Sequence, residues 1–316
     1  MHKASKLVVL ASIALFLPVT RTLFAAGDGR VATPVFSPSG GAYCSVQAVK
    51  IDDTTPNATI YYTTNGETPT TSSTKYSAPI TVSKTATIKA IAEAAGHETS
   101  AVGSSTYTFH VHDREWVLCK LDEAAKNFRS TQADFQFDSV ETDPIYEKDV
   151  QKGTVYYERK AGAFQMSAHI SEFNGKPVPK IYAYTGGAVK LYEPLINQLT
   201  TFSKAAQYES WFMLGFGASG KDLEQMWEIK YIGSEILDGV KTEMLEMVPK
   251  DPAIRKNLSK VTLWVDPIRG VSLKQVLNFG PTEYKVCVYF NIRVNEPLPV
   301  GVFTIKTNSK TVLVNR

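Results

Sequence analysis

Apolar and polar residues alternate with a period of two along most of the chain, as in β-strands with one buried face. Up to about Phe109 the alternating runs are short, and turn clusters such as 53–57 and 65–67 separate them. Several short strands at this spacing predict a small antiparallel β-sandwich. The strands expected in it are Ser45–Ile51, Thr59–Thr63, Thr85–Ile91 and Ser104–Phe109.

The rest of the chain opens with a helical pattern and then returns to alternation. Asp113 is a suitable N-cap, Glu115 lies in the first turn, and Val117, Leu121 and Phe128 recur at helical spacing. The alternation that follows predicts one large, strongly curved antiparallel sheet, with further helices only at Glu209–Gly217 and in short turns after Ser219 and Asp251. The expected strands are a run around 133–137, Gly153–Arg159, Ala163–Ile170, Ile181–Tyr184, Ala188–Tyr192, Trp227–Ile232, Lys241–Val248, Lys260–Asp266, Val271–Leu277 and Glu283–Val294.

Apolar residues gather on one face of these strands and on the expected helix at 209–217. That helix is apolar nearly all round, so it is buried on two sides or it covers an apolar cavity. Periodicity alone favours an ordinary core, and an apolar cavity is the alternative. The candidate cavity residues are Val155, Tyr157, Phe164, Met166, Leu191, Phe212, Met213, Leu214 and Phe216.

Arg159 does not fit the ordinary-core interpretation. By alternation it shares the face of Val155 and Tyr157, where an unpaired charge would cost several kcal/mol. We therefore expect Arg159 at a rim, donating hydrogen bonds to backbone carbonyls such as those at a helix end.

The first residues have the pattern of an export signal. Lys3 and Lys6 precede an apolar run from Leu7 to Leu17, which is too short to span a bilayer, and small residues follow near position 26. No cysteine follows the run, so lipid anchoring through an N-terminal cysteine is not expected. Without Lys3, Lys6 and Arg21 the 34 basic residues become 31, equal to the 31 acidic ones, and this neutral balance argues against nucleic acid as a partner.

The cysteines and histidines predict no metal site or cofactor. Cys44, Cys119 and Cys287 have no metal-ligand spacing; the pair Cys119 and Cys287 could form a disulfide, or all three could be buried thiols. His110 and His112 could suggest a metal, but a solvated linker is favoured because no further ligand is evident nearby. His97 and His169 are expected to be inert.

No motif for catalysis is present in the sequence. A glycine cluster at 215–221, which ends in Lys221, superficially resembles a phosphate loop, but its spacing is wrong and no buried strand precedes it. With few histidines and no Gly-x-Ser-x-Gly or His-Glu-x-x-His motif, we expect a protein that is not an enzyme.

Two parts of the chain resemble known families. The run Tyr61–Thr70, followed by Tyr76–Ile80 and Thr87–Ala92, resembles the chitobiase/β-hexosaminidase C-terminal type of immunoglobulin-like module, which is an accessory module without an active site. From about Trp116 to Val314 the chain resembles the LolA-type outer-membrane lipoprotein carriers. The matching segments are Phe128…Ala133…Phe135, Gly153–Arg159 with Phe164, Leu191–Pro194 with Gln198, Trp211–Leu214, and Phe303 with Ile305.

The second resemblance implies a fold and a function. The fold is an incomplete antiparallel β-barrel with a helical lid over an apolar cavity, and Arg159 is the lid latch that bonds lid backbone. The function is a monomeric periplasmic carrier that binds acyl chains of lipoproteins or other lipids, with an inner-membrane release complex and an outer-membrane receptor as partners. A non-catalytic structural or glycan- or protein-binding module of the cell envelope is the alternative. The expected segments are a signal peptide at 1–26, the β-sandwich at 31–109, a linker at 110–113 and the carrier-like half-barrel at 114–316.

Overall fold

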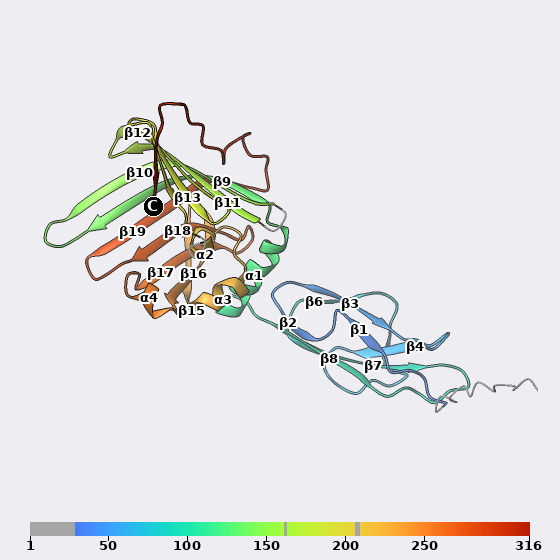
Figure 1. Cartoon of the computed structure of the whole chain (residues 1–316). Coiled ribbons are helices and arrows are strands. Elements are labelled where there is room, and N and C mark those ends of the chain that lie inside the picture. The colour runs from blue at the N-terminus through green and yellow to red at the C-terminus, as the bar shows by residue number, and fades with distance from the viewer. Residues whose placement is uncertain (1–28, 161–162, 206–208) are drawn as a thin grey trace, which may run out of the picture. The chain divides into compact units, whose positions relative to one another are not determined.

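A computed structural model describes residues 29–160, 163–205 and 209–316 (Figure 1). The expected signal peptide lies outside the described residues. The chain forms two compact units. The first contains the described residues up to Gly40 together with Ala48–Ile80 and Ala86–Thr106, and the second contains Gly41–Gln47, Thr81–Thr85 and Tyr107–Arg316.

The N-terminal strands form two sheets, one with the order β1-β3-β6 and one with the order β2-β8-β7-β4-β5. Val49, Ile51 and Ile88 are buried between them, as expected from the alternation in their strands. The four predicted strands are all present, and the others are only two or three residues long, which is too short for a period-two pattern. The strands are β1 (Val35–Ser37), β2 (Gly41–Tyr43), β3 (Gln47–Asp52), β4 (Thr59–Thr63), β5 (Thr74–Lys75), β6 (Ile80–Val82), β7 (Ala86–Glu93) and β8 (Gly103–Phe109).

The second unit contains a 12-stranded sheet with the order β15-β16-β17-β18-β19-β9-β10-β11-β12-β13-β14-β20. All neighbours are antiparallel except β14 and β20. The strands are β9 (Ser130–Glu141), β10 (Glu147–Lys160), β11 (Ala163–Phe173), β12 (Lys176–Thr185), β13 (Ala188–Glu193), β14 (Gln198–Phe202), β15 (Trp227–Leu237), β16 (Val240–Pro249), β17 (Lys260–Asp266), β18 (Val271–Asn278), β19 (Glu283–Val294) and β20 (Val312–Asn315).

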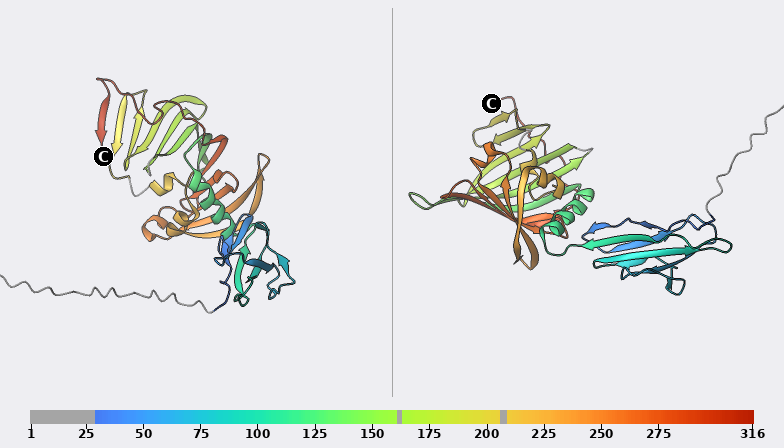
Figure 2. Two further views of the ribbon diagram at one scale, coloured as in Figure 1. Left: turned by 90° about the vertical axis from the view of Figure 1, so that its right-hand side faces the viewer. Right: turned by 90° about the horizontal axis from the view of Figure 1, so that it is seen from below.

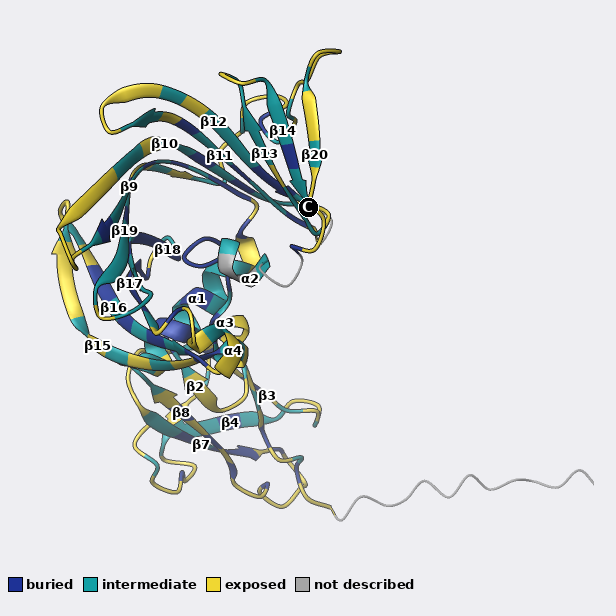
Figure 3. Ribbon diagram, turned by 60° about the vertical axis from the view of Figure 1, so that its left-hand side comes forward, coloured by how far each residue is buried: buried dark blue, intermediate teal, exposed yellow. Residues whose placement is uncertain are grey.

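This sheet is an open, strongly curved layer whose two edge strands, β15 and β20, do not meet (Figure 2). Its helices lie on the concave side (Figure 3). They are α1 (Arg114–Asn127), α2 (Glu209–Phe212), α3 (Gly220–Met226) and α4 (Pro252–Arg255). The predicted fold class, a mainly β chain with a sandwich and an incomplete antiparallel barrel, is therefore confirmed.

Helix α1 begins where the sequence predicts it. The Asp113 side chain accepts a hydrogen bond from the Trp116 backbone N–H at 2.7 Å, which satisfies one of the free donors of the first turn. Val117, Leu118 and Leu121 are buried, and they pack in one hydrophobic cluster with α3 and with strands β15 to β17. The apolar face of α1 is thereby covered by α3 and by this part of the sheet.

Two predictions about the later chain are wrong. The helix predicted at 209–217 is only Glu209–Phe212, and the following residues form turns in which Gly215 and Gly217 have positive φ angles. Phe303 and Ile305 lie in no strand, because Pro297, Pro299 and Gly301 interrupt this segment. The last strand is β20, which pairs in parallel with β14.

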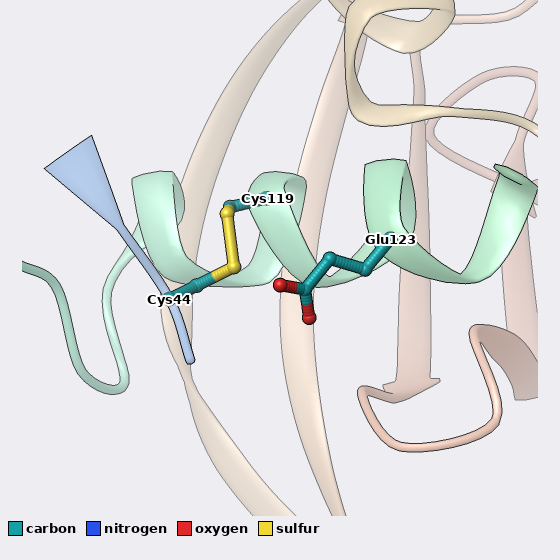
Figure 4. A group of neighbouring side chains, drawn as sticks. All are labelled: Cys44, Cys119 and Glu123. Atoms are coloured by element: carbon teal, nitrogen blue, oxygen red, sulfur yellow. A yellow bond between two sulfur atoms is a disulfide. The ribbon is translucent and has the colours of Figure 1, made fainter. Parts of the chain in front are cut away.

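The disulfide also differs from both sequence-based alternatives, because Cys44 bonds to Cys119 (Figure 4). Cys119 lies on α1, whereas Cys287 is a buried free thiol on β19. Cys287 faces Tyr157 and Tyr289 in a different hydrophobic cluster, so it is out of reach of Cys119. Glu123 lies beside the disulfide and accepts a hydrogen bond from the Ser45 hydroxyl at 2.5 Å.

The segment between β19 and β20 is tied to the convex face of the sheet by His169. The ring Nε2 of His169 lies 3.1 Å from the Val302 carbonyl oxygen and 3.0 Å from Ser167 Oγ, and Tyr156 packs against the ring. Burial lowers the pKa of His169 below its usual 6.5, although the bond to Val302 opposes this.

Acidification should therefore destabilise the folded protein, because protonation places a charge on a half-buried ring at a desolvation cost that the bond to Val302 only partly offsets. Because the folded-state pKa of His169 is depressed, its contribution to stability is present above about pH 6.5 and is lost as the pH falls through the folded-state value. We expect the free energy of unfolding, measured by urea titration between pH 7 and pH 5, to fall more steeply in the wild type than in His169→Gln. Equal pH dependence in the two proteins would contradict this assignment.

Candidate functional site

An apolar cavity of about 420 Å³ lies on the concave face of the large sheet. Its volume is within the range of about 300–1,000 Å³ that is usual for ligand pockets. It is lined by Phe135, Phe137, Gln151, Val155, Tyr157, Met166, Ala168, Ile170, Tyr182, Ala183, Val189, Phe212, Cys287 and Tyr289.

The strand register explains why these residues meet. Val155 on β10 pairs with Ala168 on β11, and Ala168 pairs with Tyr182 on β12. Because residues in register share a face, these three form one row across the sheet, and the residues two positions away form the neighbouring rows. The apolar half of each alternating strand thus becomes the wall of one cavity.

Among the described residues that line the cavity, none has a charged side chain. Its polar groups include the hydroxyls of Tyr157 and Tyr289 and the thiol of Cys287, which interact with one another. Burial raises the pKa of Cys287 to about 12 and the pKa values of Tyr157 and Tyr289 still further. All three groups are therefore neutral at physiological pH, and the cavity suits an uncharged, apolar ligand.

Residues 209–217, which we call the lid segment, border this cavity. Phe212 lines it, and Phe216 stacks on Tyr157 at 4.6 Å between ring centroids. The Leu214 carbonyl accepts a hydrogen bond from Gln275 Nε2 at 2.6 Å, and the Gly215 carbonyl accepts one from the Ser272 N–H at 2.8 Å. The lid segment is therefore joined to strand β18.

Arg159 contacts the end of the lid segment. Its Nη2 donates to the Gly217 carbonyl at 2.9 Å, and its guanidinium lies 6.0 Å from the centre of the Phe128 ring. The carbonyl and the ring partly compensate for the desolvation of the charge at this half-buried position. This is the kind of contact, to a backbone carbonyl next to a helix, that the alternation argument predicts for Arg159.

The structure distributes the sequence-predicted cavity residues over four environments. Val155, Tyr157, Met166 and Phe212 line the cavity. Phe164, Met213 and Phe216 belong to the hydrophobic cluster around it, while Leu214 is buried in the cluster under α1 and α3. Leu191 pairs with Tyr182 but lies outside the lining.

Sequence reasoning did not single out several lining residues, notably Tyr182, Cys287 and Tyr289. Each lies in an apolar run, with Ile181 and Ala183 beside Tyr182 and with Val286, Val288 and Phe290 beside the other two, and this run was the available signal. That pattern identifies a buried face, but it does not reveal that strands β12 and β19, far apart in sequence, face the same space.

The histidine pair of the expected linker has partners in the second unit. His112 Nδ1 lies 2.7 Å from the buried carboxylate of Glu243, which also accepts a hydrogen bond from the Tyr231 hydroxyl. His110 lies beside Asp113 and Glu115, so carboxylates are closer to it than the sequence suggested. Asp113 is already engaged as the cap of α1.

Comparison with known proteins supports the first resemblance. Residues 38–104 match the family model of the chitobiase/beta-hexosaminidase C-terminal domain. None of the curated proteins matches the chain by sequence.

Similar solved structures include LolA-superfamily proteins. One chain of the Pseudomonas aeruginosa MucA/MucB complex is 12% identical, with a TM-score of 0.39 over 61% of this chain and 61% of that one. A putative outer membrane lipoprotein-sorting protein domain from Vibrio parahaemolyticus is 12% identical, with a TM-score of 0.35 over 61% and 97% of the two chains. A LolA superfamily protein from Nitrosomonas europaea is 16% identical, with a TM-score of 0.33 over 61% and 98%.

The fold class rests on the sheets and helices described above rather than on these similarities. The protein is a mainly β molecule that has an N-terminal β-sandwich and a half-barrel with an apolar cavity on its concave face. Among the residues that the structure describes, every helix is too short or too polar to span a bilayer.

Proposed function

We propose that the protein is a non-catalytic carrier that binds acyl chains of lipoproteins or related lipids in the cavity of its half-barrel. The observation that carries this proposal is the uncharged, largely aromatic and aliphatic cavity of about 420 Å³ that the lid segment borders. A linear acyl chain needs apolar surface and no polar recognition along its length, which is what this lining offers.

The energetics suit reversible binding. Each buried methylene contributes about 0.8 kcal/mol, so about ten methylenes contribute about 8 kcal/mol. The loss of translational freedom and the displacement of lid contacts offset part of this gain. The resulting affinity is strong enough to capture an acyl chain and weak enough to pass it on.

Arg159 acts in this proposal as a latch that holds the carboxyl end of the lid segment. We expect Arg159→Leu to preserve the fold but to destabilise the closed state, because one charge-assisted bond to Gly217 is lost. Transfer of a bound acyl probe to acceptor vesicles should then become slower, since closure of the empty cavity drives release. Transfer rates and affinities equal to those of the wild type would contradict the latch role.

The proposed setting is the periplasm. Residues 1–26 would act as the export signal, residues 31–109 as an accessory module and residues 114–316 as the carrier, with 110–113 as the linker. An inner-membrane release complex would supply the cargo, and an outer-membrane receptor would accept it from the monomeric carrier.

A titration with a fluorescent fatty acyl probe tests the proposal. We expect saturable binding with a dissociation constant in the micromolar range or below, and mass spectrometry of the purified protein should identify co-purifying acyl lipids. The absence of saturable binding by neutral and anionic acyl probes alike would contradict a carrier function.

A second candidate is a structural or glycan- or protein-binding module of the cell envelope. The match of residues 38–104 to an accessory domain of glycan-processing enzymes favours it. In that case the sandwich would bind envelope glycan or protein, and the acyl titration would give no signal.

A further inference from the structure

Another cavity, of about 430 Å³, is separate from the half-barrel cavity, and the described residues that line the two have no member in common. Its lining comes from one face of α1, from the turn between β17 and β18 and from the end of β19, all within the second compact unit. Its volume is also within the range of about 300–1,000 Å³ that is usual for ligand pockets. The proposed carrier function makes no use of this cavity.

Close packing of α1 against the turn forms the cavity. Lys120, Ala124 and Phe128 recur every four residues, so they lie on the same side of the helix. The turn approaches this side so closely that a Cβ atom on Gly270 would come within 2.2 Å of Ala124 Cβ. Gly270, whose φ is +65°, thereby brings the neighbouring Arg269 to the helix and into the lining.

Asp266 holds the Arg269 guanidinium by one edge only. Arg269 Nε donates to Asp266 Oδ2 at 2.6 Å, and the buried Asp266 also accepts hydrogen bonds from the backbone N–H groups of Ile268 and Arg269. Among the residues that the structure describes, the two Nη groups of Arg269 have no hydrogen-bond or ion-pair partner. A planar guanidinium that is fixed at Nε and has free Nη donors is suited to hold a carboxylate.

The charges of the lining favour a ligand with a single negative charge. Lys120 and Glu123 form an ion pair at 3.0 Å. Burial opposes the ionisation of Glu123, but hydrogen bonds from Ser45 and Lys120 outweigh it and hold the pKa of Glu123 below its usual 4.5. Glu123 is therefore a carboxylate at neutral pH, and together with Lys120 and Arg269 it leaves the described lining with one net positive charge. A monoanion balances this charge, whereas a dianion would be repelled by Glu123 without full compensation.

Much of the remaining lining is apolar. The side chains that contribute apolar surface include Trp116, Phe128, Pro267 and Val294. A ligand that fills the cavity therefore gains by carrying its charge at one end and burying an apolar group against these side chains.

We propose that this cavity binds a small monocarboxylate with a compact apolar body, such as an aromatic acid. The carboxylate accepts hydrogen bonds from the Nη groups of Arg269, Lys120 adds a second positive charge, and the apolar body packs against Trp116 and Phe128. This site is independent of acyl-chain binding in the half-barrel cavity.

An NMR titration of the intact protein with indole-3-acetate and benzoate tests the proposal. Trp116 lines the cavity and its indole N–H donates to the Cys44 carbonyl, so this N–H resonance, assigned with Trp116→Phe, reports binding. We expect a saturable shift with a dissociation constant of about 1 mM or below for ligands of this size. Indole-3-acetamide has the same shape without the charge, and its affinity should be about tenfold lower or less, because the charge-assisted bonds to Arg269 are lost.

Substitution of the two cations tests the assigned contacts. Arg269→Gln should weaken indole-3-acetate binding about tenfold or more and leave the affinity for the amide unchanged. Lys120→Gln should act in the same direction, and it keeps the test informative if loss of the partner of buried Asp266 prevents Arg269→Gln from folding. Arg255→Gln is the matched control, because Arg255 also forms an ion pair, with Glu228, but lies outside the cavity lining.

Three results would each overturn the proposal: no saturable shift with either acid, equal affinities for indole-3-acetate and its amide, or wild-type affinity in both Arg269→Gln and Lys120→Gln. Met166→Glu, which places a charge in the half-barrel cavity, should bind indole-3-acetate as the wild type does. Loss of binding in Met166→Glu would place the ligand in the half-barrel cavity and would also overturn the proposal.

Discussion

Replacement of Met166 by glutamate is expected to abolish acyl binding while leaving the protein folded. Met166 lines the cavity and is only partly buried, so the new carboxylate can reach water in the empty protein. A bound acyl chain would cover that carboxylate without giving it a partner, at a cost of several kcal/mol. The affinity for a fluorescent acyl probe should therefore fall by about 100-fold or more.

The control for this experiment is Ser171→Glu on the same strand. Ser171 is exposed and lies outside the cavity lining, so it receives the same charge without facing the ligand. Its affinity should equal that of the wild type. If Met166→Glu binds the acyl probe as tightly as this control, acyl chains bind outside the cavity. If neither variant binds the probe, the protein does not bind acyl chains.

Loss of the Cys44–Cys119 disulfide is expected to have the largest effect on stability. The bond joins residues 75 positions apart, and the loop-entropy relation gives up to about 4.5 kcal/mol for a loop of that length. For a chain of this size, such a change should lower the melting temperature by about 10 °C or more. Thermal unfolding of the wild type with and without a reducing agent, and of the double variant Cys44→Ser/Cys119→Ser, measures it.

The free cysteine supplies the control for the redox experiment. Cys287→Ser keeps the disulfide and should show the same loss of stability on reduction as the wild type, because Cys287 takes no part in the bond. A melting temperature that does not depend on the reducing agent would contradict a stabilising disulfide.

Most of the fold follows from local patterns. The predicted helix at Asp113 and the predicted long strands are present, because alternation over six or more residues reflects a buried face whatever the neighbouring strand is. Patterns of two or three residues carry no such information, so β1, β2, β5 and β6 were missed. The Glu209–Gly217 prediction was too long because Gly215 and Gly217 adopt positive φ angles to approach β18 and Phe128 closely.

The candidate site was only partly predictable. Arg159 stood out because a charge on an apolar face needs a partner, but its partner, the Gly217 carbonyl, lies 58 residues later. Tyr184 shows no signal in the sequence, since a tyrosine in a strand usually belongs to the core. Its contacts with Glu209 and Phe212 are visible only in the tertiary structure.

The sequence by itself determined the secondary structure class, the apolar faces of the strands and helix α1, because these depend on residues close together in the chain. Only the tertiary structure decided which cysteines pair, which of the apolar residues surround open space, and which contacts hold α2. The physical reason is that a cavity differs from a core only in how completely distant strands fill the space between them. That depends on the curvature and register of a 12-stranded sheet, which the period of any one strand does not encode.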